Sequence, residues 1–387
     1  MTNDVKTEGL GPFQIMSLRF TCTLVIFGVF STVVGQSVND RKDKLLNVFN
    51  IVKFPNDGCN ATSGSYGVCY TTSECSSLGG SSSGSCASGF GVCCLFSGGC
   101  GDSTSLNNTY FRSSPSDSSE CSFKVCKASP DICQIRLGFD TFVISQPSTD
   151  YPGDDEQNGR TQCQESQFSA TSDGPPAPII CGTNTAHHMI LEARDDCNEL
   201  KFTWVSSATT TPNWNIHIMQ ISCFADWKPQ DGCLQYFTGL TGYIKSYNYD
   251  EGYHLADQQY TNCIRAGRGY CSIAYSQVST TSFQVGEITP TASPTPGGKL
   301  GDSCTTDYIV LVGAGASADA TVNYDRFCGS LLAVSPSTPT TAATVYTNKM
   351  PFQLNVAFDG SELDEDSPAG TEWSTGFYIY YSQVACT

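Results

Sequence analysis

The chain has 387 residues and a formal net charge of −17, and only 15% of its residues are charged. Because Lys and Arg are not clustered to hold phosphates, this balance argues against nucleic acid as a partner. The 36 glycines, 18 tyrosines and 21 phenylalanines favour strands and turns over long helices, and the length has room for about two or three domains.

Residues 1–36 are predicted to be a signal peptide with an N-terminal extension. Arg19 precedes a short apolar segment, Phe20–Phe30, that ends in small or modest side chains suited to cleavage. This segment is too short and too rich in Ser and Thr for a stable membrane span, and a retained signal anchor is the alternative. Everything before Met16 fits an upstream extension. In residues 37–54, the apolar spacing fits either a short amphipathic helix or a strand.

The cysteines predict secretion into an oxidising compartment. Of the 21 cysteines, Cys22 lies in the leader, which leaves an even set, and the four histidines and the lack of C-x-x-C pairs argue against zinc. An even set behind a leader predicts a disulfide framework. The predicted disulfide cysteines are Cys59, Cys69, Cys75, Cys86, Cys93, Cys94, Cys100, Cys121, Cys126, Cys133, Cys163, Cys181, Cys197, Cys223, Cys233, Cys263, Cys271, Cys304, Cys328 and Cys386.

Residues 55–96 are predicted to form a small disulfide-rich module. Gly-Ser tracts such as Gly79–Gly84 cannot build an apolar core, so cross-links worth about 2–4 kcal/mol each must hold it. The spacing alone does not choose among the possible pairings of its six cysteines. Four separated cysteines followed by an adjacent pair resemble the clip domains of arthropod extracellular proteins. That resemblance implies the pairs Cys59–Cys93, Cys69–Cys86 and Cys75–Cys94.

Clip domains often precede a serine protease, but the sequence predicts no catalytic residues and no enzyme. Gly80–Gly84 matches the nucleophile-elbow pattern by letter, yet no predicted strand precedes it and no helix follows. Gly301–Cys304 imitates part of a protease serine motif without its following glycines, and the histidines lack a protease-like context.

Residues 97–225 are predicted to form a first β-sandwich. Alternating apolar residues predict strands at Cys121–Cys126 and Ile132–Phe142. The turn residues Lys127–Asp131 between them predict a hairpin, which a Cys126–Cys133 disulfide would staple. Farther along, Cys163 and Cys181 close a bridged segment, and Cys197 and Cys223 bracket two more predicted strands, Leu200–Trp204 and Trp214–Ile221.

Residues 233–387 are predicted to form a second sandwich. In Phe352–Phe358 every second residue is large and apolar, and the period recurs at Phe377, Ile379 and Tyr381, as in half-buried antiparallel strands. Cysteine-glycine pairs close the bridged segments of both units, at Cys181-Gly182 and Cys328-Gly329, so an internal repeat is predicted.

The second unit resembles a CUB domain through Cys304-Thr-Thr-Asp307-Tyr308 and Asp325–Gly329, and Gly239–Tyr249 resembles the opening of such a domain. The resemblance implies an all-β fold with two CUB-like antiparallel β-sandwiches after the small disulfide-rich module. It also implies the pairs Cys233–Cys263 and Cys304–Cys328, which leaves Cys271 and Cys386 for each other. The whole order resembles arthropod secreted CUB-domain proteins, most specifically at Ile132–Asp140, Cys181–Asn184 and Tyr236–Gly239.

The CUB resemblance also implies a calcium site in the second unit, formed by Glu287, Asp307 and Asp359. Calcium takes roughly six to eight oxygen ligands, so converging loop carboxylates suit it. The alternative is that these are solvated loop carboxylates. In the first unit Ser166 stands where the pattern needs an aspartate, so calcium is not expected there.

Two further surface features are predicted. Asn60 and Asn107 open N-glycosylation sequons in loop-like context. Tyr247, Tyr249 and Tyr253 are candidates for a carbohydrate- or protein-binding surface, with packing at the sandwich edge as the alternative.

These features predict a secreted, extracellular, non-enzymatic binding protein. Its expected partner is an extracellular protein or a glycan, contacted by loops at the sandwich ends. The alternative is a hydrolase, or a cofactor or docking protein for an extracellular protease cascade, with the clip-like module as the docking part.

Overall fold

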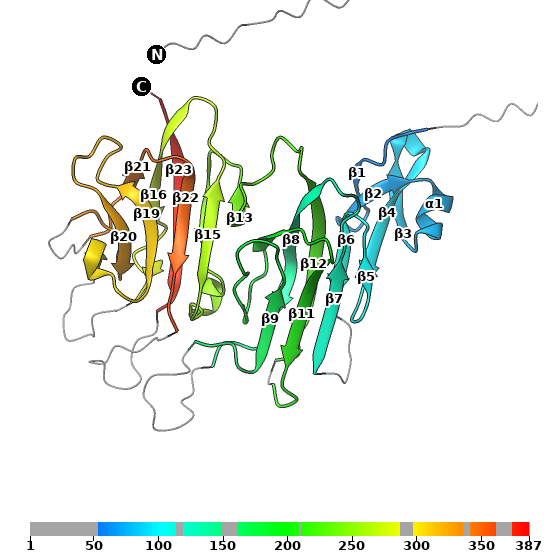
Figure 1. Ribbon diagram of the computed structural model, residues 1–387, viewed down its shortest axis with the longest axis horizontal. Helices are drawn as coiled ribbons and strands as arrows, with labels where there is room; N and C mark the ends of the chain where they lie inside the picture. The colour runs from blue at the N-terminus through cyan, green and yellow to red at the C-terminus, as the bar shows by residue number, and fades with distance from the viewer. Residues whose placement is uncertain are drawn as a thin grey trace, which may run out of the picture. The chain divides into compact units, whose positions relative to one another are not determined.

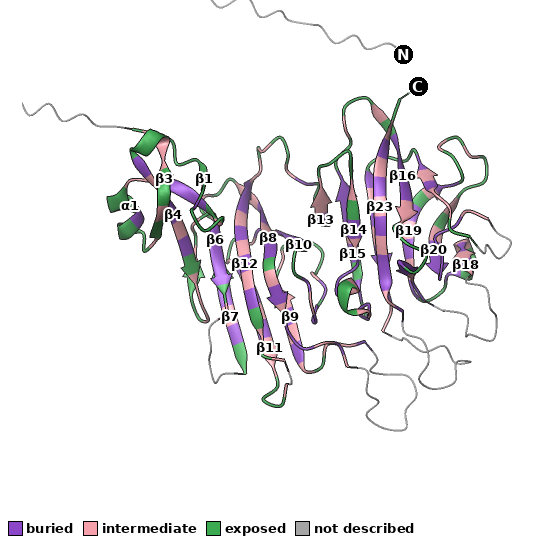
Figure 2. Ribbon diagram, turned by 180° about the vertical axis from the view of Figure 1, so that it is seen from behind, coloured by how far each residue is buried: buried purple, intermediate pink, exposed green. Residues whose placement is uncertain are grey.

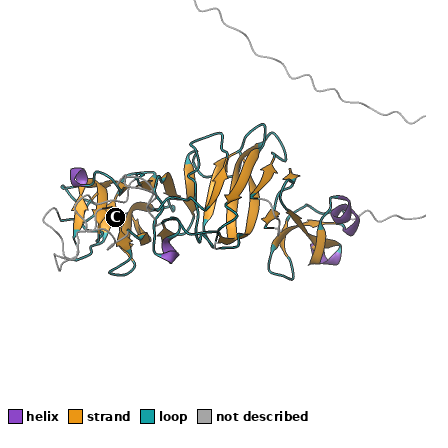
Figure 3. Cartoon of the chain, turned by 90° about the horizontal axis from the view of Figure 1, so that it is seen from below, coloured by secondary structure: helices purple, strands orange, loops and turns teal. Residues whose placement is uncertain are grey.

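The computed structural model of the protein describes residues 53–113, 119–148, 161–208, 210–286, 297–335, 341–360 and 374–386. Strands are the main regular structure of these residues, with one α-helix and three short 3₁₀ helices, so the predicted all-β class is confirmed (Figure 3). Within the described ranges, no helix combines the length and the apolar character that a membrane crossing needs. The predicted signal peptide and the segment that follows it, through residue 52, lie outside the described residues.

The N-terminal module, residues 53–98, is a small sheet held by three disulfides, Cys59–Cys93, Cys69–Cys86 and Cys75–Cys94. Its helix begins with a capping box, in which the Thr71 side chain accepts the Glu74 N–H and Glu74 accepts the Thr71 N–H. Its elements are β1 (Gly58–Asn60), β2 (Tyr66–Tyr70), α1 (Thr72–Ser77), β3 (Ser81–Cys86), η1 (Ala87–Gly89) and β4 (Gly91–Gly98). Because β4 also pairs in parallel with β6, the module continues into the next sheet.

Residues 103–222 form the first sheet pair, and strands of the N-terminal module extend one of its two sheets. An eight-stranded sheet runs β1-β2-β4-β6-β12-β8-β10 with β3 beside β4, and a four-stranded sheet runs β5-β7-β11-β9 (Figure 1). Aromatic side chains join their inner faces, with Phe202 stacked on Trp214 at 3.9 Å and Phe111 on Phe123 at 4.8 Å between ring centroids. The strands are β5 (Ser103–Thr104), β6 (Thr109–Arg112), β7 (Glu120–Val125), β8 (Ile132–Val143), β9 (Ser166–Ala170), β10 (His188–Glu192), β11 (Asn198–Trp204) and β12 (Asn213–Ser222).

The predicted strands at Cys121–Cys126 and Ile132–Phe142 are present as β7 and β8, but the predicted hairpin is wrong. The turn between them carries the chain from the four-stranded to the eight-stranded sheet, so the two strands do not pair. Cys126 therefore bonds Cys197 at the start of β11, and Cys133 bonds Cys223 after β12. Cys126–Cys133 is not a disulfide, and Cys197 and Cys223 are not joined to each other. The other disulfides of this part are Cys100–Cys121 and Cys163–Cys181.

The second sheet pair spans residues 233–385. A six-stranded sheet runs β13-β15-β22-β19-β20-β18, and a five-stranded sheet runs β14-β23-β16-β21 with β17 beside β23. Its elements are β13 (Cys233–Phe237), β14 (Thr241–Lys245), η2 (Tyr249–Glu251), β15 (Gln259–Ile264), β16 (Tyr270–Gln277), β17 (Phe283–Gln284), β18 (Gly298–Leu300), η3 (Gly301–Ser303), β19 (Tyr308–Ala314), β20 (Tyr324–Gly329), β21 (Val345–Thr347), β22 (Phe352–Ala357) and β23 (Gly376–Ala385).

Alternating burial along β22 and β23 confirms the predicted half-buried strands of the second sheet pair. The same stripes of buried and less buried residues are visible on β12 and β23 (Figure 2). Disulfides Cys233–Cys263, Cys271–Cys386 and Cys304–Cys328 hold this part. With ten bonds linking all twenty cysteines from Cys59 onward, the predicted disulfide framework is confirmed.

A polar network joins the two sheet pairs where β10 lies beside β13. The Tyr236 N–H donates to His188 Nε2 at 2.7 Å, and the Tyr247 hydroxyl donates to the His188 carbonyl at 2.9 Å. Next to it, the Asn248 N–H donates to Asn184 Oδ1, and Asn248 Oδ1 accepts the Thr183 N–H, both at 2.9 Å. Because Asn184 and Asn248 are fully buried, these bonds replace water that neither side chain can reach.

Candidate functional site

Two of the predicted calcium ligands meet at one end of the second sheet pair. Asp307 directly precedes β19 and Asp359 follows β22, and the antiparallel register that places Tyr308 opposite Ala357 brings the two acids together. Asp307 is only 3% exposed, and its Oδ1 accepts the Asp359 N–H at 2.7 Å. This bond fixes the late loop against the start of β19.

A third acid, Asp257, lies beside this pair and was not predicted from the sequence. Its N–H donates to the Asp359 carbonyl at 2.7 Å. A Cβ on Gly360 would lie 3.0 Å from Asp257 Oδ1, so this carboxylate borders the same loop. Asp257 precedes β15, and only the pairing of β15 with β22 brings it there, so no local sequence signal marks it.

The loop after β17 completes the described surroundings of Asp307. Gly286 has a φ of +71°, and a Cβ there would come within 2.8 Å of the Asp307 carbonyl oxygen, so the close approach requires glycine. The Ser374 hydroxyl donates to the Gly286 carbonyl at 3.0 Å. Glu287, the third predicted calcium ligand, is the next residue along the chain and lies outside the described residues.

The described residues do not by themselves provide a metal centre. In the ranges that the structure covers, no three His, Cys, Asp or Glu side chains are grouped to hold an ion. The structure does bring Asp307 and Asp359 together, and carboxylate oxygens are ligands that suit calcium. Calcium binding and the part of Glu287 in it stay predictions.

The two sequon asparagines both lie at the surface. Asn60 ends β1 and is exposed. Asn107 is also exposed, although its Oδ1 accepts the N–H groups of Asn108 at 2.9 Å and Gln220 at 2.8 Å. Glycosylation at these positions stays a prediction.

The predicted aromatic surface needs one correction. Tyr247 is 1% exposed because its ring packs between His187 and Tyr260 and its hydroxyl bonds the His188 carbonyl, so it belongs to the junction between the sheet pairs. Tyr249 and Tyr253 are partly exposed. The most exposed tyrosine in this region is Tyr243, at 55%.

Three histidines are held in the neutral form. Burial lowers the pKa of His188 to about 3, with Arg136 adding to the effect, and lowers that of His187 to about 4. Burial and Arg136 likewise lower the pKa of His217 to about 4. The fourth, His254, is fully buried and its ring meets that of Phe358 edge-on at 4.5 Å.

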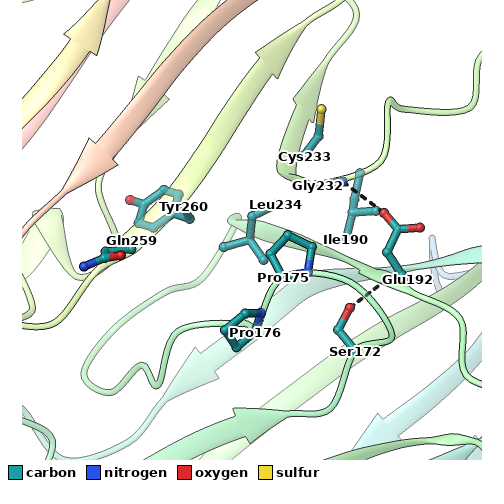
Figure 4. A pocket seen from close by; sticks show the side chains of 10 residues that line it. All are labelled: Ser172, Pro175, Pro176, Ile190, Glu192, Gly232, Cys233, Leu234, Gln259 and Tyr260. Carbon is teal, nitrogen blue, oxygen red and sulfur yellow. Dashed lines mark hydrogen bonds between the residues drawn. The ribbon is translucent and has the colours of Figure 1, made fainter.

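A small cavity lies at the junction of the sheet pairs (Figure 4). Its volume is about 20 Å³, which is room for one water molecule, and Pro175, Leu234 and Tyr260 are among its lining residues. Glu192 closes one side, since its Oε1 accepts the Gly232 N–H at 3.2 Å. This cavity is too small to be the ligand site.

The comparisons with known proteins bear on the second sheet pair. Residues 230–384 match the family model described as the animal CUB domain. Among solved structures, the CUB1-EGF-CUB2 domains of rat MASP-1 are 13% identical, covering 74% of this chain and 99% of that one, with a TM-score of 0.24. The CUB1-EGF-CUB2 domain of human MASP-1/3 is 14% identical, covering 70% and 96%, with a TM-score of 0.22. No curated protein matches the chain.

Proposed function

We propose that this protein is a secreted, non-enzymatic binding protein that recognises an extracellular protein or glycan. CUB domains are non-catalytic modules that generally mediate interactions between proteins, and residues 230–384 match that family. The observation that carries the proposal is the bond between Asp307 and Asp359, which holds two loop acids in place at one end of the second sheet pair. A pre-ordered loop loses less entropy when a partner binds.

The domain plan supports this proposal. We assign residues 55–96 to a clip-like module, 97–225 to a first CUB-like domain and 233–387 to a second. In favour of a repeat, the Cys163–Cys181 and Cys304–Cys328 bonds each end at a cysteine followed by a glycine with positive φ, +75° at Gly182 and +89° at Gly329. Ten disulfides in the described chain suit an oxidising, extracellular setting.

Calcium at Glu287, Asp307 and Asp359 is part of the proposal. The ion would supply a positive centre in a chain of net charge −17 and would tie three loops together. Calorimetric titration of the secreted chain with calcium tests this, with Asp359→Asn as the variant and the exposed Asp302→Asn as its matched control. Saturable heat that Asp359→Asn removes and Asp302→Asn keeps supports the site, and no heat with the unaltered chain refutes it.

The partner is tested by capture from extracellular fluid. The secreted chain and its Asp307→Asn variant serve as baits, and bound proteins and glycans are identified. Capture of a matrix protein or glycan that the variant loses supports the proposal. Capture of a protease zymogen would instead favour the alternative, a docking cofactor. That alternative draws on the clip-like module, whose disulfides Cys59–Cys93, Cys69–Cys86 and Cys75–Cys94 are the pairs that the clip resemblance implies.

A further inference from the structure

Arg136, in the middle of β8, is a half-buried cation that lacks a hydrogen-bond partner among the described residues, and Asp140 is the acid whose charge acts on it. Within the residues that the structure describes, its guanidinium makes no hydrogen bond and no ion pair, whereas half-buried Lys127, Lys228 and Lys245 each contact an aspartate. Burial lowers the pKa of Arg136, but a guanidinium stays protonated at any physiological pH. Guanidinium N–H donors that lose water on folding and gain no acceptor lower the stability of the fold. A bound anion would supply the missing acceptors.

The guanidinium of Arg136 packs against Gly138, which has no side chain to displace it. A Cβ at Gly138 would lie 2.9 Å from Arg136 Nη1, so the guanidinium rests over the glycine backbone. In the sheet, Gly138 pairs with His217 of β12 on one side and with His188 of β10 on the other. Three strands far apart in the sequence therefore surround one place on the outer face of the eight-stranded sheet.

Arg136 supplies the positive charge there, because both histidines are neutral. His188 Nε2 accepts the Tyr236 N–H at 2.7 Å, so that nitrogen carries no proton. His217 Nε2 lies 3.1 Å from Asn108 Oδ1, an acceptor, so its proton is on Nε2 and its Nδ1 is left as an acceptor. Within the described chain, Nδ1 of His217 makes no hydrogen bond and can receive one from a hydroxyl group.

Asp140 is the acid on this face, and its charge partly offsets that of Arg136 without a direct bond between them. Asp140 Oδ2 accepts from Asn215 Nδ2 at 3.4 Å, and the Arg112 Nε–H donates to Asn215 Oδ1 at 3.3 Å. Two arginines and one aspartate leave this patch with a charge of +1 in a chain of −17. Distant acids are screened beyond about 8 Å at physiological salt, but they still repel a polyanion that runs across the surface. A ligand with a single negative charge therefore suits the patch best.

An aromatic side chain borders the site. The Tyr110 ring is stacked on His217 at 4.8 Å, and the Tyr66 ring lies 6.1 Å from His217. Tyr110 is 1% exposed, whereas Tyr66 is 41% exposed and offers a ring surface on the side of His217. The C–H face of a sugar ring packs on such a surface, and an acidic peptide has no flat ring for it.

We propose that Arg136, His217 and Tyr66 form a binding site for a sugar that carries one carboxylate, such as a hexuronic acid. The guanidinium holds the carboxylate with two parallel N–H donors, His217 Nδ1 accepts a sugar hydroxyl, and Tyr66 covers the ring. This inference deepens the proposed function, on which it rests, by naming a ligand class and a second surface away from Asp307 and Asp359.

Titration of the secreted chain with glucuronate tests the proposal, with glucose, acetate and a glutamate-rich peptide as separate arms. The binding heat and the NMR pKa of His217 are both measured. We expect saturable glucuronate binding, weaker acetate binding, none for glucose, and a rise in the His217 pKa, because a bound anion offsets Arg136. Equal affinity for acetate, or preference for the peptide, refutes the sugar assignment.

Arg136→Gln should weaken glucuronate binding about tenfold or more, since it removes a charged donor pair. The exposed Arg268→Gln is the matched control and should leave it unchanged. Tyr66→Ala, a second variant in case Arg136→Gln folds poorly, should weaken glucuronate and spare acetate. Unchanged binding in a folded Arg136→Gln overturns the site. If the chain does not bind glucuronate but still captures an extracellular partner, only the sugar site is refuted. If the chain binds glucuronate but captures no partner, the result counts against the proposed function.

Discussion

We expect the free energy of unfolding to fall in mild acid, because two neutral histidines lie at the junction between the sheet pairs. His188 Nε2 can accept the Tyr236 N–H only while it is unprotonated, so a proton on it breaks that bond and leaves a buried cation near Arg136. His187 is partly buried, and there Asp250 favours its charged form and Lys245 opposes it, while the loss of water outweighs both. Both histidines must therefore stay neutral in the folded chain.

The size of this loss in unfolding free energy follows from the difference in proton binding between the folded and the unfolded chain. The folded pKa values of about 3 for His188 and about 4 for His187 lie below the ordinary value of 6.5, so the unfolded chain binds more protons between these limits. Stability is fully present above about pH 6.5 and declines as the pH falls toward the folded values. At about pH 5, each histidine costs about 2 kcal/mol of unfolding free energy, or about 4 kcal/mol together.

Urea unfolding at about pH 7.5 and about pH 5 measures this loss. Tryptophan fluorescence follows unfolding, because Trp214 is 2% exposed in the first sheet pair, which carries both histidines. In His188→Gln the amide oxygen can replace Nε2 as acceptor and does not titrate, so the loss should shrink by about 2 kcal/mol. His187→Asn combined with it should remove about 4 kcal/mol. The reasoning is refuted if the double variant loses as much stability between the two pH values as the unaltered chain.

Three other outcomes are expected. Peptide mapping of the intact protein should recover Cys126 linked to Cys197, and a peptide that joins Cys126 to Cys133 would contradict the described fold. Phe202→Ala should destabilise the first sheet pair by about 3–5 kcal/mol in urea unfolding, because it deletes a buried ring stacked on Trp214, and a loss below about 1 kcal/mol would be inconsistent with that packing. Gly286→Ala should lower the melting temperature, since its Cβ would meet the Asp307 carbonyl at 2.8 Å with φ at +71°, and an unchanged melting temperature would count against that contact.

Strand positions could be predicted from the sequence wherever one face of a strand is buried. The two-residue period of Phe352–Phe358 predicted β22 because its inward side chains are apolar and their neighbours are partly exposed. Turn residues do not say which sheet receives the next strand. The turn after β7 therefore predicted a hairpin, while the chain crosses to the other sheet, and the pairing of Cys126 and Cys133 changed with it.

The acidic loop was predicted in part, and only through resemblance to CUB domains. Asp307 and Asp359 lie beside strands whose pattern carries that resemblance, and the register of β19 with β22 does bring them together. Asp257 shares their loop region only because β15 pairs with β22. For Tyr247 the sequence left a binding surface and packing both open, and the structure shows packing, since the first sheet pair covers its ring through His187 and His188.

Arg136 had no signal at all in the sequence, and register explains why. Its neighbours His188 and His217 are about 50 and 80 residues away along the chain, and they meet only because both pair with Gly138. A slip of one residue in β8 would turn Leu137 outward and Arg136 into the core. The register that buries Leu137 is therefore the register that brings Arg136, His188 and His217 together, so selection for a well-packed core also keeps these three side chains together.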